Sequence, residues 1–203
     1  MSTEKYTAHY RCFNGCRERY ALDDLLYTCP QCGSLLEVQH DFAALQKRIG
    51  TEWRALFDSR HPVHVTPPWA QSGIWSKREW VLPEIDDANI VSLGEGNTPL
   101  LPARQLGVEC GLEKMWLKLC GTSHTGSFKD LGMTVLISQV KQMMARGKGI
   151  HAVACASTGD TSAALAAYCA AAGIPAVVLL PENKITGAQL LHPQANGALT
   201  MAL

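Results

Sequence analysis

Lys129 lies in a segment whose residue types favour amine chemistry. Ser127 and Asp130 stand three residues apart, as in a capping box, so a helix is predicted to begin here with Lys129 in its first turn. Apolar residues recur behind it at helical spacing, and Gly147 follows as a stop. The positive end of a helix favours the neutral amine, which attacks carbonyl carbons. The segment therefore indicates a lysine nucleophile, with a solvated lysine on a helix end as the alternative.

A second loop of small polar residues, residues 157–161, also precedes a predicted helix. An apolar strand is predicted over residues 150–156, and the helix over residues 163–172. Helix N-termini present unpaired N–H groups and bind anions. The loop therefore suits a carboxylate or a phosphate, and the alternative is ordinary N-capping by Asp160 or Ser157.

Four cysteines near the N-terminus have the spacing of metal ligands. Cys12 and Cys16 form one close pair, and Cys29 and Cys32 form the other. Two such pairs suit a tetrahedral Zn²⁺ site with four thiolate ligands. The alternative is a ribbon that has kept its cysteines without holding a metal.

Alternating strands and helices predict an α/β fold in the second half of the chain. Continuous apolar strands indicate a parallel sheet with helices on both faces. Binding sites in such sheets lie at the carboxyl ends of strands, and both polar loops above are expected to follow a strand. The predicted strands cover residues 115–119, 150–156, 175–181 and 197–203.

Three segments are expected along the chain. Residues 1–40 are predicted to form a zinc-ribbon-like segment closed by a short strand at residues 35–38. Residues 41–90 form an aromatic-rich extension, and residues 91–203 form the α/β region. The extension is expected to begin with a helix over residues 41–49 whose one apolar face carries Phe42, Leu45 and Ile49.

Aromatic residues and prolines fill residues 53–88, so this stretch is expected to wrap over another surface. Packing against its own chain is favoured over a ligand site. Contact with a partner subunit is the alternative, because aromatic residues are enriched at interfaces.

The composition excludes some classes of function. The chain has 203 residues, 47% hydrophobic, with 18 basic and 18 acidic side chains. Zero formal net charge argues against nucleic acid and membrane surfaces as partners. No apolar run approaches the roughly 20 residues of a membrane span. Residues 1–6 carry no apolar signal core, so a cytoplasmic location with reduced cysteines is expected.

Two motifs resemble those of the threonine synthases of the plant-type branch. They are Ser-His-Thr-Gly-Ser-Phe-Lys-Asp-Leu-Gly-Met at residues 123–133 and Ala-Ser-Thr-Gly-Asp-Thr-Ser-Ala-Ala-Leu at residues 156–165. The resemblance continues through Trp53 and residues 56–60, 72–84, 95–97 and 179–185. Threonine synthases are pyridoxal phosphate enzymes of fold type II, the tryptophan-synthase-β-like fold. The Trp-rich match at residues 72–84 narrows the resemblance to them within that superfamily.

The resemblance implies a role for each site residue. Lys129 would be the lysine that binds pyridoxal phosphate covalently, with Phe128 and Asp160 also at the cofactor. The loop holding the substrate carboxylate would comprise Ser157, Thr158, Gly159 and Thr161. Much of the superfamily has asparagine in place of Asp160, donating to the phenolic oxygen of the cofactor. An ionised Asp160 cannot donate, so a shared proton, a water or a cation is required there.

The implied reaction is that of a carbon–oxygen lyase acting on phosphates in threonine biosynthesis. It converts O-phospho-L-homoserine and water to L-threonine and phosphate. The family suggests a homodimer. No loop suited to the cofactor phosphate follows residues 157–161, so the chain is expected to be the N-terminal part of an enzyme, with an incomplete sheet.

Three alternative functions match parts of the sequence. Cysteate synthase, or another eliminating or replacing pyridoxal phosphate enzyme, is the alternative within this class. A nucleotide hydrolase is disfavoured, because the lysine of a P-loop directly follows its second glycine, whereas Lys129 lies three residues after Gly126. A zinc-ribbon module that binds nucleic acid is disfavoured by the neutral charge.

Overall fold

The structure is a computed structural model that describes residues 5–60, 68–182 and 187–202. Residues 61–67 of the aromatic-rich extension lie outside the described residues. So do residues 183–185 of the 179–185 motif and Leu203 at the end of the last predicted strand. No helix in the described part of the chain is long and apolar enough to cross a membrane.

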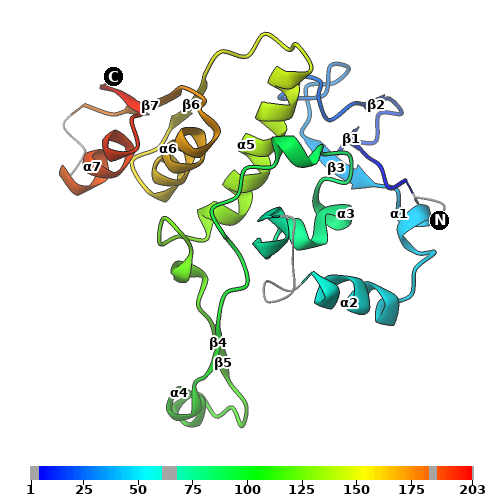
Figure 1. The fold of residues 1–203 in the computed structure, drawn as a ribbon, viewed down its shortest axis with the longest axis vertical. Coiled ribbons are helices and arrows are strands. Elements are labelled where there is room, and N and C mark those ends of the chain that lie inside the picture. The colour runs from blue at the N-terminus through cyan, green and yellow to red at the C-terminus, as the bar shows by residue number, and fades with distance from the viewer. Residues whose placement is uncertain (1–4, 61–67, 183–186, 203) are drawn as a thin grey trace.

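A small antiparallel sheet, which we call the cysteine ribbon, forms near the N-terminus from residues 8–40. Its strands are β1 (Ala8–Cys12), β2 (Arg19–Tyr20) and β3 (Leu36–His40), in the order β2-β1-β3 (Figure 1). The closing strand predicted at residues 35–38 is β3, which pairs along its whole length with β1.

The prediction of one helix over residues 41–49 is wrong. The chain forms a single turn, α1 (Phe42–Leu45), capped by Asp41, and then a separate helix, α2 (Gly50–Ser59). A second helix begins because the Glu52 carboxylate accepts a hydrogen bond from the Ile49 N–H at 3.0 Å. The expected apolar face is consequently not buried, since Phe42 and Ile49 are 60% and 62% exposed.

The aromatic-rich extension packs against its own chain. Trp53 of α2 lies 5.3 Å, centroid to centroid, from Trp80 of α3 (Arg78–Val81). Trp75 is fully buried, and its indole N–H donates to Thr134 at 2.7 Å. Buried indole N–H groups need such a partner, so this bond fixes the extension onto the helix that carries Thr134.

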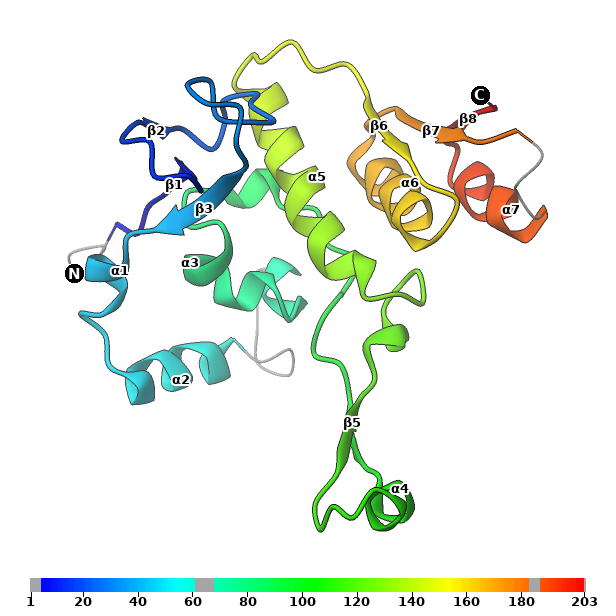
Figure 2. The same cartoon turned by 180° about the vertical axis from the view of Figure 1, so that it is seen from behind.

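That helix, α5 (Lys129–Ala145), runs through the centre of the molecule. Figures 1 and 2 show it between the N-terminal segments and α6 (Asp160–Ala172). It ends before Gly147, as predicted, where a φ of 79° suits glycine. Because α5 is covered on two sides, its buried residues do not form the single apolar face that the sequence suggested.

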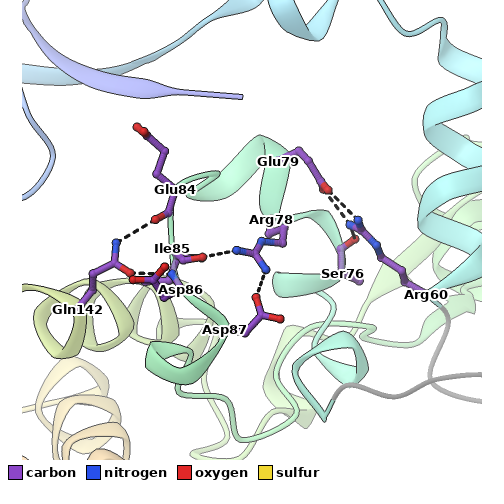
Figure 3. A network of polar contacts seen from close by, with 9 residues as sticks. All are labelled: Arg60, Ser76, Arg78, Glu79, Glu84, Ile85, Asp86, Asp87 and Gln142. Carbon is purple, nitrogen blue, oxygen red and sulfur yellow. Dashed lines mark hydrogen bonds and ion pairs between the residues drawn. The ribbon is translucent and has the colours of Figure 1, made fainter. Parts of the chain in front are cut away.

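Three polar side chains of α5 at four-residue spacing hold the backbone of the preceding segment. Thr134 donates to Val91 O at 2.7 Å, and Ser138 accepts from Val91 N at 2.8 Å. Gln142 accepts from Asp86 N at 2.7 Å and donates to Glu84 O at 3.1 Å (Figure 3). The i, i+4, i+8 spacing places all three on one face of the helix, so this face holds the backbone of residues 84–91 in position.

An ion pair joins two parts of the aromatic-rich extension. Arg60 of the extension makes two hydrogen bonds to the Glu79 carboxylate, at 2.8 and 2.7 Å (Figure 3). Burial raises the pKa of Glu79, but the hydrogen bonds from Arg60 and the positive charges of Arg60 and Arg78 outweigh it and hold the pKa below its ordinary value.

A hairpin arm projects from the body (Figures 1 and 2). Strands β4 (Leu100–Pro102) and β5 (Trp116–Lys118) pair antiparallel and flank α4 (Arg104–Glu109). The strand predicted at residues 115–119 therefore exists, but it does not belong to the parallel sheet, so the lysine loop does not follow a strand of that sheet as expected. The strand pairs with β4 instead because the hairpin closes locally: Leu119 N donates to Pro99 O at 2.9 Å.

The parallel sheet that the sequence predicted comprises β6 (Val153–Ala156), β7 (Ala176–Leu180) and β8 (Leu199–Ala202). The connecting helices are α6 and α7 (Gly187–Ala195), and both lie on the same face of the sheet (Figure 1). Val178 and Leu180 of β7 are buried in the core beneath them. Alternation along the strands leaves Leu199 and Met201 exposed.

A buried carboxylate joins the extension to this core. Glu95 is fully buried and accepts hydrogen bonds from Tyr168 Oη at 2.7 Å, Leu93 N at 2.9 Å and Ser92 Oγ at 3.0 Å, as well as from the Ser72 hydroxyl. A buried carboxylate is tolerated when it is satisfied in this way. Burial, together with the neighbouring Glu95 charge, raises the pKa of Tyr168, so the phenol stays protonated as a donor.

The backbone must approach closely beside this carboxylate. Gly73 N donates to Glu95 O at 2.8 Å. A Cβ atom added to Gly73 would lie 2.3 Å from Asn97 N. Glycine is therefore required at position 73 for the extension to reach Glu95.

We predict that Tyr168→Phe destabilises the protein, because Glu95 would lose a buried donor to its charge. The expected loss in the free energy of unfolding is about 1.5–3 kcal/mol. Urea unfolding followed by circular dichroism measures it. Tyr27→Phe is the control, because the Tyr27 side chain is 86% exposed. Equal stability of both variants and the parent would show that Glu95 does not depend on Tyr168.

Candidate active site and metal cluster

Lys129 is the first residue of α5, as predicted, and is half-buried. Its backbone N–H donates to Ser127 Oγ at 3.2 Å, and its Nζ lies 4.7 Å from the centroid of the Phe128 ring. Phe128 is 56% exposed, so the amine and the ring lie together at an accessible edge of the molecule. This arrangement leaves the lysine reachable by a carbonyl compound.

The capping box predicted from Ser127 and Asp130 is wrong. The fully buried Asp130 carboxylate accepts from Thr125 N at 2.8 Å and from the Thr125 hydroxyl instead. The reason is a turn closed by Gly126 N donating to Ser123 O at 2.9 Å, which folds the preceding loop back over the helix start. Asp130 therefore fixes the lysine loop and leaves Ser127 free for another partner.

That partner comes from the second polar loop. Ser127 Oγ donates to Asp160 Oδ2 at 2.9 Å. Ser127 itself is 5% exposed, whereas Asp160 lies at the surface. The two loops singled out in the sequence therefore meet, although one follows the antiparallel hairpin and the other follows the parallel strand β6.

The second loop is a helix N-terminus without a side-chain cap. Gly159 is the N-cap residue of α6, and Asp160 points to Ser127 instead of capping the helix. Ser157 Oγ accepts from Gly159 N at 3.3 Å. Ser157, Thr158 and Thr161 are half-buried around this end and Gly159 is exposed. Ser162 N donates to Gly159 O at 3.1 Å, whereas the N–H groups of Asp160 and Thr161 precede any acceptor within the helix, so this end suits an anion.

These residues fit a cofactor that carries both an aldehyde and anionic groups. The half-buried Lys129 begins α5 two residues after Ser127, and Ser127 contacts Asp160 at the N-terminus of α6, an end that suits anions. Asp160 accepts a hydrogen bond from Ser127, so its carboxylate acts as an acceptor at this edge. The sequence indicated only a capping role for Ser127, although its position two residues before Lys129 was a signal for a role at the site.

The four predicted metal ligands come together at one end of the cysteine ribbon. The sulfur atoms of Cys12, Cys16, Cys29 and Cys32 all lie within 4.8 Å of one another. The Sγ atoms of Cys12 and Cys32 are 3.5 Å apart. Tetrahedral Zn²⁺ with bonds of about 2.3 Å places its sulfur ligands roughly 3.8 Å apart, so the cluster fits this ion with small adjustments.

Backbone donors favour the thiolate form of Cys29, whereas hydrogen bonds with Cys32 and Cys12 raise the pKa of Cys16 to about 12. Burial raises the pKa of Cys29, but hydrogen bonds from the backbone N–H groups of Cys32 and Gln31 outweigh it and lower the pKa to about 6. Thiolates are the form that binds metals. None of the eight cysteines, all of which lie in the described residues, forms a disulfide.

Comparison with known proteins gives one family and a consistent group of relatives. The family model described as pyridoxal-phosphate dependent enzyme matches residues 91–202. "Threonine synthase 2, chloroplastic" of Arabidopsis thaliana is 53% identical over 98% of this chain and 39% of its own length. Threonine synthase of Methanocaldococcus jannaschii is 37% identical over 93% of this chain and 41% of its own length.

The chain spans about two fifths of the length of these curated relatives. Among solved structures, the apo form of Escherichia coli diaminopropionate ammonia lyase aligns with 61% of this chain and 40% of its own, at 16% identity and a TM-score of 0.46.

We predict that Ser127 and Asp160 are energetically coupled, because a neutral donor contacts a charged acceptor between two helix starts. A double-mutant cycle with Ser127→Ala and Asp160→Ala should give a coupling energy of about 0.5–1.5 kcal/mol in urea unfolding. Strictly additive effects of the two substitutions would contradict the contact. Pairing Ser127→Ala with Glu109→Ala, on the distant hairpin arm, is the control and should be additive.

Proposed function

Because the chain belongs to the pyridoxal-phosphate-dependent enzyme family, we propose that it forms the lysine-bearing part of a threonine synthase. The proposed reaction converts O-phospho-L-homoserine and water to L-threonine and phosphate. The observation that carries the proposal is the 53% identity to a threonine synthase over nearly the whole chain. The meeting of the Lys129 loop and the Ser157–Thr161 loop through Ser127 and Asp160 supports it.

Lys129 is the proposed catalytic residue. Pyridoxal phosphate, when bound, supplies an electron sink for charge that develops at the substrate. In this proposal the Lys129 amine holds the cofactor and then carries protons at Cα and Cβ of the substrate. Its half-buried place in the first turn of α5, beside the Phe128 ring, supports this.

The second loop is proposed to bind the substrate carboxylate. Ser157, Thr158, Gly159 and Thr161 surround the N-terminus of α6, whose first-turn N–H groups suit an anion. Phe128 and Asp160 are proposed to contact the cofactor beside Lys129. Because Asp160 accepts from Ser127, its contact with a phenolic oxygen would need a shared proton or a bridging water.

We also propose one structural Zn²⁺ bound by Cys12, Cys16, Cys29 and Cys32. The clustering of the four sulfur atoms within 4.8 Å supports it. The role is structural, because four protein ligands leave no open position for a substrate.

Other features of the intact enzyme remain proposals. These are a homodimer, a cytoplasmic location and the division into residues 1–40, 41–90 and 91–203. The Arabidopsis relative is named as a chloroplastic protein.

We predict that borohydride traps pyridoxal phosphate on Lys129 in the complete gene product. Lys129→Ala should lower the rate of threonine formation from O-phospho-L-homoserine by at least about a hundredfold, because proton transfer needs the amine. Peptide mapping and product analysis measure the two effects. Lys148→Ala is the control, because this lysine lies beyond the C-terminal end of α5.

Normal threonine formation by Lys129→Ala would contradict the assignment of Lys129. Turnover of O-phosphoserine in place of O-phospho-L-homoserine by the parent enzyme would instead contradict the proposed substrate and favour a cysteate-synthase-like reaction.

We predict about one zinc per chain in protein purified without added metal. Cys32→Ser should lose most of this zinc, because the ligand set would be incomplete. Cys110→Ser should keep it, because this exposed cysteine lies on the hairpin arm and outside the cluster. Elemental analysis measures both. A zinc-free protein with all four thiols titratable would contradict the site.

A further inference from the structure

We propose that metal binding by the cysteine ribbon is coupled to α5, so that the metal-loaded ribbon braces the helix that begins with Lys129. The proposal rests on the zinc site proposed above and is independent of the reaction assigned to Lys129. It treats the ribbon as a metal-dependent support for the candidate active site.

The ribbon contacts α5 through the loop that directly follows β2. Gln139 Nε2 of α5 donates to Leu22 O at 2.9 Å. The Leu22 side chain packs against the buried cluster of Trp75, Leu82 and Ile85, and Val135 of α5 packs against the same cluster. Figures 1 and 2 both show the ribbon beside the C-terminal half of α5. The contact therefore combines a directed hydrogen bond with apolar burial.

Charged groups orient the same loop. Asp23 lies 3.4 Å from Arg146, just after the end of α5, and Asp24 lies 3.9 Å from Lys148. Asp24 also accepts from Ala21 N at 3.0 Å, which closes the loop on itself. Exposed ion pairs contribute little on their own, so Leu22 and Gln139 are expected to carry most of the contact.

The position of this loop in the chain makes it depend on the metal. It lies between the two cysteine pairs, after Cys16 and before Cys29. Its neighbour β2 has two residues and pairs with β1 at two positions. So short a strand does not hold a loop by itself. Four bonds to one metal would close the segment between the pairs and restrict the loop to its docked position.

The helix carries this constraint toward the candidate active site. Gln139 and Lys129 lie on one continuous helix, about 15 Å apart along its axis at a rise of 1.5 Å per residue. The helix start is in turn tied to α6 through Ser127 and Asp160. Loss of the ribbon contact should therefore increase opening of the C-terminal half of α5 and, to a smaller degree, of its first turns.

Hydrogen exchange of the full chain, followed by mass spectrometry with and without Zn²⁺, tests the proposal. Binding is measured separately with Co²⁺, whose absorption reports four thiolate ligands. With metal, amides in residues 135–147 should exchange about tenfold more slowly than without it. Cys32→Ser should remove this difference.

Two variants separate coupling from metal binding. Gln139→Ala and Leu22→Ser should bind Co²⁺ as the parent does, yet lose the metal-dependent protection of α5. Lys141→Ala should keep it, because Lys141 lies on the same helix but donates to Ala88 O at 3.0 Å, away from the ribbon. If Leu22→Ser does not fold, Gln139→Ala alone tests whether metal binding is coupled to α5.

Three results would overturn the proposal. The first is that metal slows hydrogen exchange only in residues 8–40. The second is that metal-dependent protection of α5 persists in Gln139→Ala. The third is a chain that binds no metal, which would also remove the zinc site while leaving the proposed role of Lys129 untouched.

Discussion

The buried carboxylate of Glu95 is the constraint on which the rest of the structure depends. A charge removed from water must be fully hydrogen-bonded, and its donors come from Ser72 of the extension, from Ser92 and Leu93 beside it, and from Tyr168 of α6. These groups can satisfy Glu95 only when the extension and the α/β region are packed together. The carboxylate therefore couples the conformation of the chain around Glu95 to the packing of the extension against the α/β region. Misplacing either part would leave a buried charge without donors.

This packing determines where Lys129 lies. The helix α5 is held on one side by the extension, through Trp75 and the buried polar groups Thr134, Ser138 and Gln142. On the other side it packs against α6 within the main core. With both sides fixed, the segment just before α5 contacts the first residue of α6 through Ser127 and Asp160. The proposed nucleophile Lys129 and the proposed anion-binding loop thereby come from elements that are far apart in the sequence.

Local patterns were predictable and long-range partners were not. The spacing of the four cysteines predicted their clustering, and the small-residue motif placed Lys129 at a helix start. The capping role of Ser127 was wrong because its partner, Asp160, belongs to another loop. The strand at residues 115–119 was found, but its antiparallel pairing depends on residues 100–102. The burial of Glu95 was not predicted, since two of its donors, Ser72 and Tyr168, lie far from it in the sequence.

The central claim is that the extension and the α/β region form one cooperative unit that positions Lys129. Urea unfolding followed by two probes tests it most directly. Tryptophan fluorescence reports mainly the extension, which contains Trp53, Trp69, Trp75 and Trp80, and far-ultraviolet circular dichroism reports mainly α5 and α6, the longest helices described. The account predicts coincident transitions with a single midpoint. Loss of the fluorescence signal at a lower urea concentration than the helical signal would contradict it, because α5 would then keep its structure without the extension.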